Sequence, residues 1–168
     1  MKKTMIIVHW LTVVLIAMAF LSIEYRSAFG KHTLFHDIMK NSHLYIGFLI
    51  LFITLFRIIA RQFVAGMSLG NPKSKLKKAI SQTFHLFLYI WLIAMPILGW
   101  CLISAKGGYS IPFGLPSIID VLPHANVVAI KDLHNTFAYV GLWVIFIHAG
   151  VALIEYYFVS RKHNIKEF

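Results

Sequence analysis

Hydrophobic residues form four long runs along the chain, and short polar segments separate the runs. They cover residues 5–24, 41–60, 79–104 and 129–159. An α-helix needs about twenty such residues to cross the apolar core of a bilayer. The segment 106–128 is broken by glycines and prolines and predicts a surface loop, whereas Pro96 is expected to kink the third helix without ending it. The pattern therefore predicts an all-α membrane protein, a single domain over residues 1–168 built as a four-transmembrane-helix bundle.

The composition agrees with a protein that lies in lipid. Hydrophobic residues make up 59% of the chain and charged residues 13%, which leaves too few polar side chains to cover a soluble domain. The net charge of +10 raises the possibility of nucleic-acid binding, but the basic residues lie between the apolar runs. We therefore expect membrane lipid, and no nucleic acid, as a partner. The single cysteine, Cys101, excludes an internal disulfide and any iron–sulfur or zinc site built on cysteines.

The distribution of positive charge predicts the orientation. Eleven of the sixteen Lys and Arg residues lie at the N-terminus, between Arg57 and Lys78, or in the C-terminal tail. By the positive-inside rule these segments are cytoplasmic, so both the N and C termini are predicted to be cytoplasmic. The first run is longer than the apolar region of a secretory signal peptide and contains His9 and Trp10, so we expect it to remain as a span.

Two histidines in the fourth run indicate the chemistry. His134 and His148 are fourteen residues apart, which on an α-helix is close to four full turns and about 21 Å of rise. Both imidazoles therefore lie on one stripe, near opposite surfaces of the bilayer. Ala138, Gly141 and Ala152 share this stripe, so a flat, bulky group has room beside each histidine. Two haems, each with an imidazole on its iron, require this arrangement.

Other spans place histidines at the same two depths. His43 in the second run matches the depth of His134 near the outer surface, and His9 in the first run matches His148 on the cytoplasmic side. A lone histidine in a membrane more often forms a hydrogen bond to a neighbouring helix. Two matched pairs instead favour haem ligation by all four. His85 shares the inner depth, and we expect it not to be a ligand.

Short motifs around these histidines resemble the bacterial cytochrome b561 family over nearly the whole chain. They are Val8-His9-Trp10, Asn41-Ser42-His43 followed by Arg57 and Arg61, Thr83-Phe84-His85-Leu86, Met95-Pro96-Ile97-Leu98-Gly99, Leu133-His134-Asn135 and Ile147-His148-Ala149. The resemblance implies a multi-pass protein of the bacterial inner membrane with two haem b groups. It implies that His9 and His148 bind the cytoplasmic-side haem iron, and that His43 and His134 bind the periplasmic-side haem iron. It also implies electron transfer with a quinone and, in the branch it matches best, superoxide:ubiquinone oxidoreductase activity.

Three charged residues are candidates for further roles, and each has a plainer alternative. Arg57 shares the stripe of His43 and is expected either to contact a haem propionate or to anchor its span at the cytoplasmic surface. Lys106 either lines a superoxide entrance, where the outer cations attract a small anion, or ends its span as an interfacial anchor. Glu155 begins a Glu-Tyr-Tyr-Phe run where the best-matching family member has His-His-Tyr-Phe. It either delivers a proton to a quinone or lies among the headgroups.

Three classes of function are compatible with these residues. The favoured class is an oxidoreductase, a dihaem b-type cytochrome that oxidises periplasmic superoxide and reduces ubiquinone. The second is a haem-bearing anchor that transfers electrons for a redox protein partner, a periplasmic dehydrogenase or hydrogenase. The third is a small transporter or channel that uses histidines for protons or metal ions. His32, His36 and His124 are expected to be exposed loop residues that either bind a metal ion or have no function, and the second alternative is favoured.

Overall fold

The computed structural model describes residues 2–30, 33–64 and 75–164, and this part of the chain is helical apart from its connections. The elements are α1 (Lys2–Arg26), α2 (Leu34–Val64), α3 (Lys75–Lys106), the 3₁₀ helix η1 (Pro112–Gly114) and α4 (His124–Asn164). Each of the four long helices contains a segment that is long and apolar enough to cross a membrane. The predicted all-α architecture with four spans is therefore confirmed.

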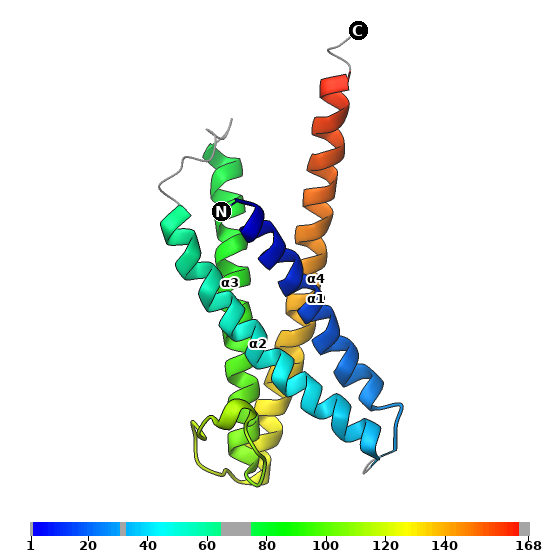
Figure 1. The fold of residues 1–168 in the computed structure, drawn as a ribbon, viewed down its shortest axis with the longest axis vertical. Coiled ribbons are helices and arrows are strands. Elements are labelled where there is room, and N and C mark those ends of the chain that lie inside the picture. The colour runs from blue at the N-terminus through cyan, green and yellow to red at the C-terminus, as the bar shows by residue number, and fades with distance from the viewer. Residues whose placement is uncertain (1, 31–32, 65–74, 165–168) are drawn as a thin grey trace.

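The helices run up and down in alternation (Figure 1). The start of α1, the end of α2, the start of α3 and the end of α4 lie at one end of the molecule, which we call the terminal end. The connection after α1 and the loop 107–123 lie at the opposite end, which we call the loop end. Both ends of the described chain thus lie on the same side of the bundle, as the charge distribution predicts.

Neighbouring helices pack in chain order, α1 on α2, α2 on α3 and α3 on α4. The buried core joins the first three helices through one cluster: Leu15, Ala19, Ile50, Trp91 and Leu92. Within the described residues, no Cα of α1 lies within 8 Å of a Cα of α4. A gap therefore separates the backbones of α1 and α4. It is bridged near the loop end, where the Tyr139 hydroxyl donates a hydrogen bond of 3.0 Å to Oε1 of Glu24.

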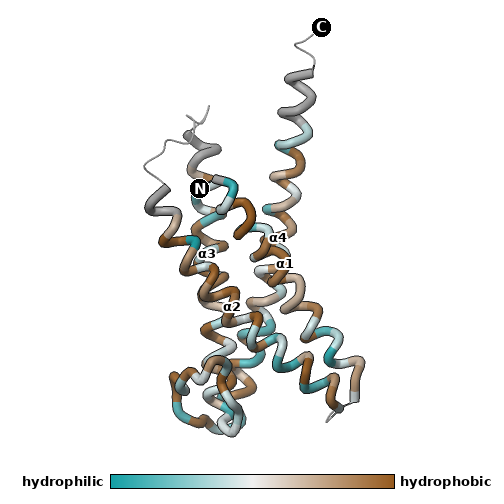
Figure 2. The backbone as a smooth tube through the Cα atoms, in the orientation of Figure 1, coloured by the Kyte–Doolittle hydropathy of each residue, from teal (hydrophilic) through white to brown (hydrophobic). Residues whose placement is uncertain are grey.

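Large apolar side chains cover the outside of the bundle. Figure 2 shows hydrophobic residues along all four helices. Trp10, Leu34, Leu86 and Trp143 are each more than half exposed, one on each helix. An apolar surface of this extent would be unfavourable in water and is favourable in contact with lipid chains.

The loop between α3 and α4 folds back onto α2 and α3. Phe113 adopts a left-handed conformation with φ of 61°, which is strained for a bulky residue. Its ring packs against Tyr45, Phe48 and Phe52, which lie on one face of α2, with ring centroids 5.3, 6.4 and 6.0 Å away. Aromatic packing onto α2 therefore offsets the backbone strain and holds η1 in place.

All four helices begin earlier than the sequence predicts, and the differences are largest for α2 and α4. α2 begins at Leu34 and not near residue 41. The Thr33 hydroxyl accepts a hydrogen bond from the backbone amide of His36 in the first turn and so caps the helix. α4 begins at His124 and not near residue 129, because the Pro123 carbonyl accepts the first helical hydrogen bonds. His36 and His124 are therefore helix residues, and their assignment to loops was wrong, whereas His32 lies outside the described residues. α3 continues through Pro96 without ending, as predicted.

Candidate functional site

The fold brings His43 of α2 and His134 of α4 together near the loop end. Their ring centroids are 6.2 Å apart and their planes are nearly perpendicular, at 80°. Two imidazoles on opposite sides of one metal ion, each with a metal–nitrogen bond of about 2 Å, have ring centres about 6 Å apart. The spacing of this pair, which comes from two distant segments of the chain, therefore fits one iron between the rings.

The hydrogen bonds of the two rings also suit metal binding. Nδ1–H of His43 donates to the Ala19 carbonyl at 2.9 Å, so the Nε2 lone pair remains available. Histidine ligands of metals commonly have such a partner, which fixes the tautomer and the ring orientation. Nδ1 of His134 is buried and has no hydrogen-bond partner in the described part of the chain. No described hydrogen bond therefore fixes the tautomer of His134, and its Nε2 is not committed to another partner.

Two glycines leave space beside these imidazoles. Gly47 lies one turn after His43, and a Cβ built there would have no atom within 4 Å. Gly99 of α3 lies against the His134 ring, and a Cβ built at Gly99 would be 3.4 Å from Cε1 of His134. The third span therefore passes close to His134 at Gly99, as predicted. The open side at Gly47, the ring spacing and the free nitrogens together fit a haem at this level.

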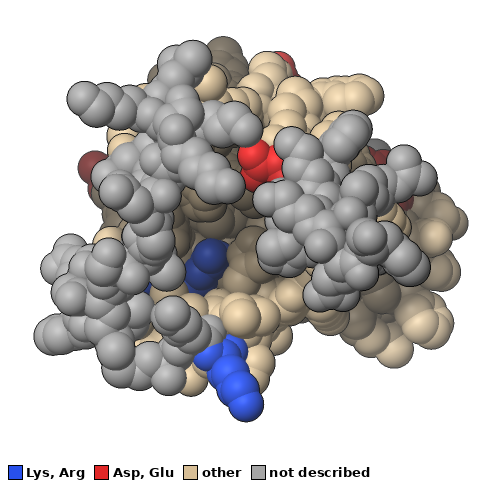
Figure 3. Space-filling model, turned by 90° about the horizontal axis from the view of Figure 1, so that it is seen from above, with Lys and Arg blue, Asp and Glu red and all other residues tan. Residues whose placement is uncertain are grey.

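A second polar cluster lies inside the bundle toward the terminal end. Nη2 of Arg57 lies 3.4 Å from Nδ1 of His9, and Nη1 of Arg57 donates to the Thr12 hydroxyl at 3.4 Å. The guanidinium also lies over the Tyr89 ring, 5.6 Å from its centroid. Figure 3 looks onto this end and shows a basic side chain recessed in a central hollow, with an acidic side chain at the rim.

These contacts favour the propionate role of Arg57 over the surface anchor. The side chain is half-buried and contacts α1 and α3 within the bundle. Its Nε is buried and has no acceptor among the described residues. A guanidinium with an unused donor is suited to bind a carboxylate, such as a haem propionate, within the bundle.

His148 is placed beside His85 and not beside His9. The rings of His85 and His148 have centroids 5.4 Å apart and planes at 86°. Nδ1–H of His85 donates to the Ser81 carbonyl at 2.6 Å. His9 and His148 lie on the two helices that border the gap between α1 and α4, and their rings make no ring–ring contact in the described structure. Over their described residues, the backbones of these two helices do not pack against each other.

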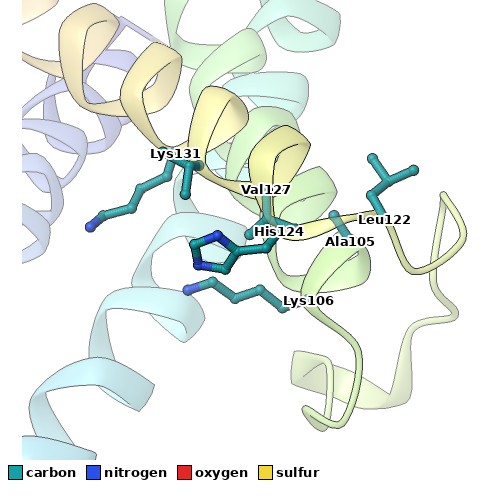
Figure 4. Close-up of a pocket in the computed structure, with 7 residues that line it drawn as sticks. Ala105, Lys106, Leu122, His124, Val127 and Lys131 are labelled. Carbon is teal, nitrogen blue, oxygen red and sulfur yellow. The ribbon is translucent and has the colours of Figure 1, made fainter.

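Lys106 lines a pocket at the loop end, about 410 Å³ in volume, between the end of α3 and the start of α4 (Figure 4). The other lining residues include His124 and Lys131, and the Lys106 and His124 side chains extend toward the same side of the pocket. Lys131 is one turn before His134 on α4, and Lys106 is two turns beyond Gly99 on α3. The pocket therefore lies closer to the loop end than the His43 and His134 pair.

Some of these features could not be found from the sequence. His124 was expected to have no function, yet it adds a third basic group to the Lys106 pocket. The sequence placed His85 at the depth of His148, but depth alone does not show that the two side chains are neighbours. Glu155 lies on an exposed turn of α4 beyond His148, and within the described chain it makes no hydrogen bond or ion pair.

Comparison with known proteins finds a matching family and similar proteins. The chain matches the prokaryotic cytochrome b561 family over residues 1–164. It is 29% identical over 157 residues to cytochrome b561 homolog 1 of Escherichia coli (strain K12). The matched region is 93% of this chain and 89% of that protein. It is 28% identical over 156 residues to a probable superoxide oxidase, CybB, of Yersinia pestis. Here the matched region is 89% of this chain and 85% of that protein.

Proposed function

Because this chain belongs to the prokaryotic cytochrome b561 family, a family of multi-pass bacterial membrane proteins with b-type haem, we propose that it is a dihaem oxidoreductase that transfers electrons from superoxide to ubiquinone. Two superoxide ions each lose one electron and become dioxygen, and one quinone takes up two electrons and two protons. The observation that carries the proposal is the His43 and His134 pair, whose 6.2 Å spacing suits one iron.

Four histidines bind the two haems. His43 and His134 hold the haem near the loop end, and His9 and His148 hold the other across the gap between α1 and α4. Each bound haem supplies a centre that accepts and releases one electron. Arg57 holds a propionate of the haem near the terminal end, since its Nε has no acceptor in the described protein.

The terminal end faces the cytoplasm in this proposal, and the loop end faces the periplasm. The support is the excess of Lys and Arg in the segments at the terminal end. The pocket of Lys106, His124 and Lys131 then opens to the periplasm, outward of the His43 and His134 pair. Its positive charge attracts superoxide, which is a small anion. The printed name of the Yersinia pestis relative, a probable superoxide oxidase, suggests the same substrate.

Reversal of the charge at Lys106 is expected to slow the reaction with superoxide. Lys106→Glu places a negative charge in the pocket, so the second-order rate constant of haem reduction should fall about tenfold at low ionic strength. The difference should shrink as salt is added, because ions screen exposed charges. Pulse radiolysis or stopped-flow spectroscopy at several ionic strengths measures the rate.

Lys3→Glu is the matched control, since Lys3 is an exposed lysine near the start of α1 at the opposite end of the bundle. It should leave the rate with superoxide unchanged. Equal slowing by both substitutions would indicate a general effect of net charge and would count against an entrance at Lys106.

Glu155 is proposed to deliver a proton to the quinone at the terminal end. It lies about two turns beyond His148 on α4 and has an exposed carboxylate. Purified protein is expected to be reduced by superoxide and then reoxidised by a soluble ubiquinone analogue. Glu155→Gln should leave the first step unchanged and slow the second, because the amide cannot carry the proton. Both steps are followed by the visible absorbance of the haem.

This experiment also separates the oxidoreductase from the alternative in which the protein is a haem-bearing anchor for a partner subunit. Two haems per chain with no reduction by superoxide would favour the anchor. Rapid reduction by superoxide and unaltered reoxidation of Glu155→Gln would keep the oxidoreductase and remove Glu155 from the quinone step.

A further inference from the structure

His85 of α3 has no role in the haem ligation proposed above, although its ring lies beside the inner ligand His148. Both side chains are half-buried at the same depth of the bundle, and their ring centroids are 5.4 Å apart with planes at 86°. We propose that His85 is the hydrogen-bond partner of His148 and that, through this bond, it lowers the reduction potential of the inner haem. The inference rests on the proposed function, in which His148 is an axial ligand of that haem.

The distance between the rings distinguishes a partner from a second ligand. Two imidazoles on one metal ion have ring centres about 6 Å apart, and the His43 and His134 rings have this spacing at 6.2 Å. Two imidazoles joined directly by an N–H···N bond of about 3 Å have ring centres about 5 Å apart. The 5.4 Å between His85 and His148 is closer to the second value. The pair is therefore better suited to a direct hydrogen bond than to sharing an iron.

The ring nitrogens of the two residues are complementary. Nδ1–H of His85 donates to the Ser81 carbonyl at 2.6 Å, which makes Nε2 the nitrogen with the lone pair. When Nε2 of His148 binds iron, the proton of that imidazole is on Nδ1, which then requires an acceptor. In the described part of the chain, no hydrogen bond joins the His85 and His148 rings, and the His148 ring makes none elsewhere, so the proposed bond is one that forms when Nε2 of His148 is bound to iron. Nε2 of His85 is thus a free acceptor beside a donor that has no other partner.

His85 is held in this orientation by a bond within α3 and by the packing of α3 against α4. The bond to Ser81 spans one turn of α3, so the helix itself fixes the imidazole plane. α3 and α4 pack directly against each other. Trp91, two turns farther along α3, donates from its indole Nε1 to the Phe137 carbonyl of α4 at 2.8 Å. The relative position of the two helices is therefore set near the two histidines.

An acceptor at Nδ1 of a haem ligand changes the redox properties of the iron. The hydrogen bond increases the electron density that the imidazole donates, and this stabilises oxidised iron more than reduced iron. The outer ligand His43 has a backbone carbonyl as its acceptor, whereas His148 would have a side chain. Unlike the carbonyl, the side chain can be removed by substitution, so the effect at the inner haem can be measured.

The test is a potentiometric titration of the purified dihaem protein, with the absorbance and the low-spin EPR signals of both haems recorded. His85→Leu removes the acceptor and is expected to shift the equilibrium toward reduced iron about tenfold, which is about 59 mV upward for one electron. The outer haem provides an internal reference, because its ligands do not contact His85, and its potential should not change. His85→Gln keeps an acceptor oxygen and should retain most of the wild-type potential.

Leu86→Ala is the matched control. Leu86 is the next residue on α3 and is 61% exposed, so its truncation changes the same helix without altering either imidazole. Two haems per chain in His85→Leu with an unchanged inner potential would overturn the inference and leave the ligand assignment intact. Loss of one haem from His85→Leu would also overturn it, since His85 would then be a ligand. A wild-type protein without haem would instead refute the proposed function.

Discussion

Substitution of His134 by alanine is expected to remove one haem per chain and to leave the other. The ring centroid of His134 lies 6.2 Å from that of His43, which is the spacing expected of two imidazoles that bind one iron. Loss of either imidazole leaves this iron with a single protein ligand in an apolar site. The pyridine haemochrome assay should therefore give half the haem content of the wild-type protein, and the remaining haem should keep its own potential.

The pairing of the ligands is tested by comparison of single and double variants. His43→Ala should remove the same spectral component as His134→Ala, and the double variant should remove no more than either. His9→Ala and His148→Ala should together define the other component. His124→Ala is the control, because His124 is an exposed histidine that lines the pocket at the loop end. It should retain both haems. Loss of different haems from His43→Ala and His134→Ala would contradict the pairing.

Substitution of Gly141 by alanine is expected to destabilise the contact between α3 and α4. Gly141 is buried, and a Cβ at this position would lie within the indole ring of Trp91. The Trp91 side chain is only 5% exposed and is held by its bond to the Phe137 carbonyl, so it has little freedom to move. Overpacking of this kind costs about 1–3 kcal/mol. Since Gly141 lies seven residues from both His134 and His148, displacement of α4 should reduce the haem content at both levels.

The unfolding temperature in detergent and the haem content measure this effect. Gly150→Ala is the matched control on the same helix, because a Cβ at Gly150 has no atom within 4 Å. It should unfold at the wild-type temperature. Combining Gly141→Ala with Trp91→Ala should cost less than the sum of the single changes, since the second change removes the clash. A Gly141→Ala protein as stable as Gly150→Ala would show that α3 and α4 adjust without strain.

Features that depend on neighbours along one helix follow from the sequence alone. The four apolar runs predict four spans, because a helix must satisfy its own backbone in lipid. The common stripe of His134 and His148 is a consequence of helical periodicity, as is the position of Gly47 one turn after His43. The boundaries near Leu34 and His124 were placed less well. They depend on single capping contacts at Thr33 and Pro123.

Contacts between helices were decided by the tertiary structure. His9, His85 and His148 share one depth, and only the packing of α3 on α4 places His85 beside His148. In the same way, packing turns Arg57 toward His9 and Thr12, and brings the Lys106 and His124 side chains to one pocket. The physical reason is that periodicity sets where a side chain lies around its own helix axis. The crossing angles and distances between helices, which decide what it meets, depend on how all the side chains interlock.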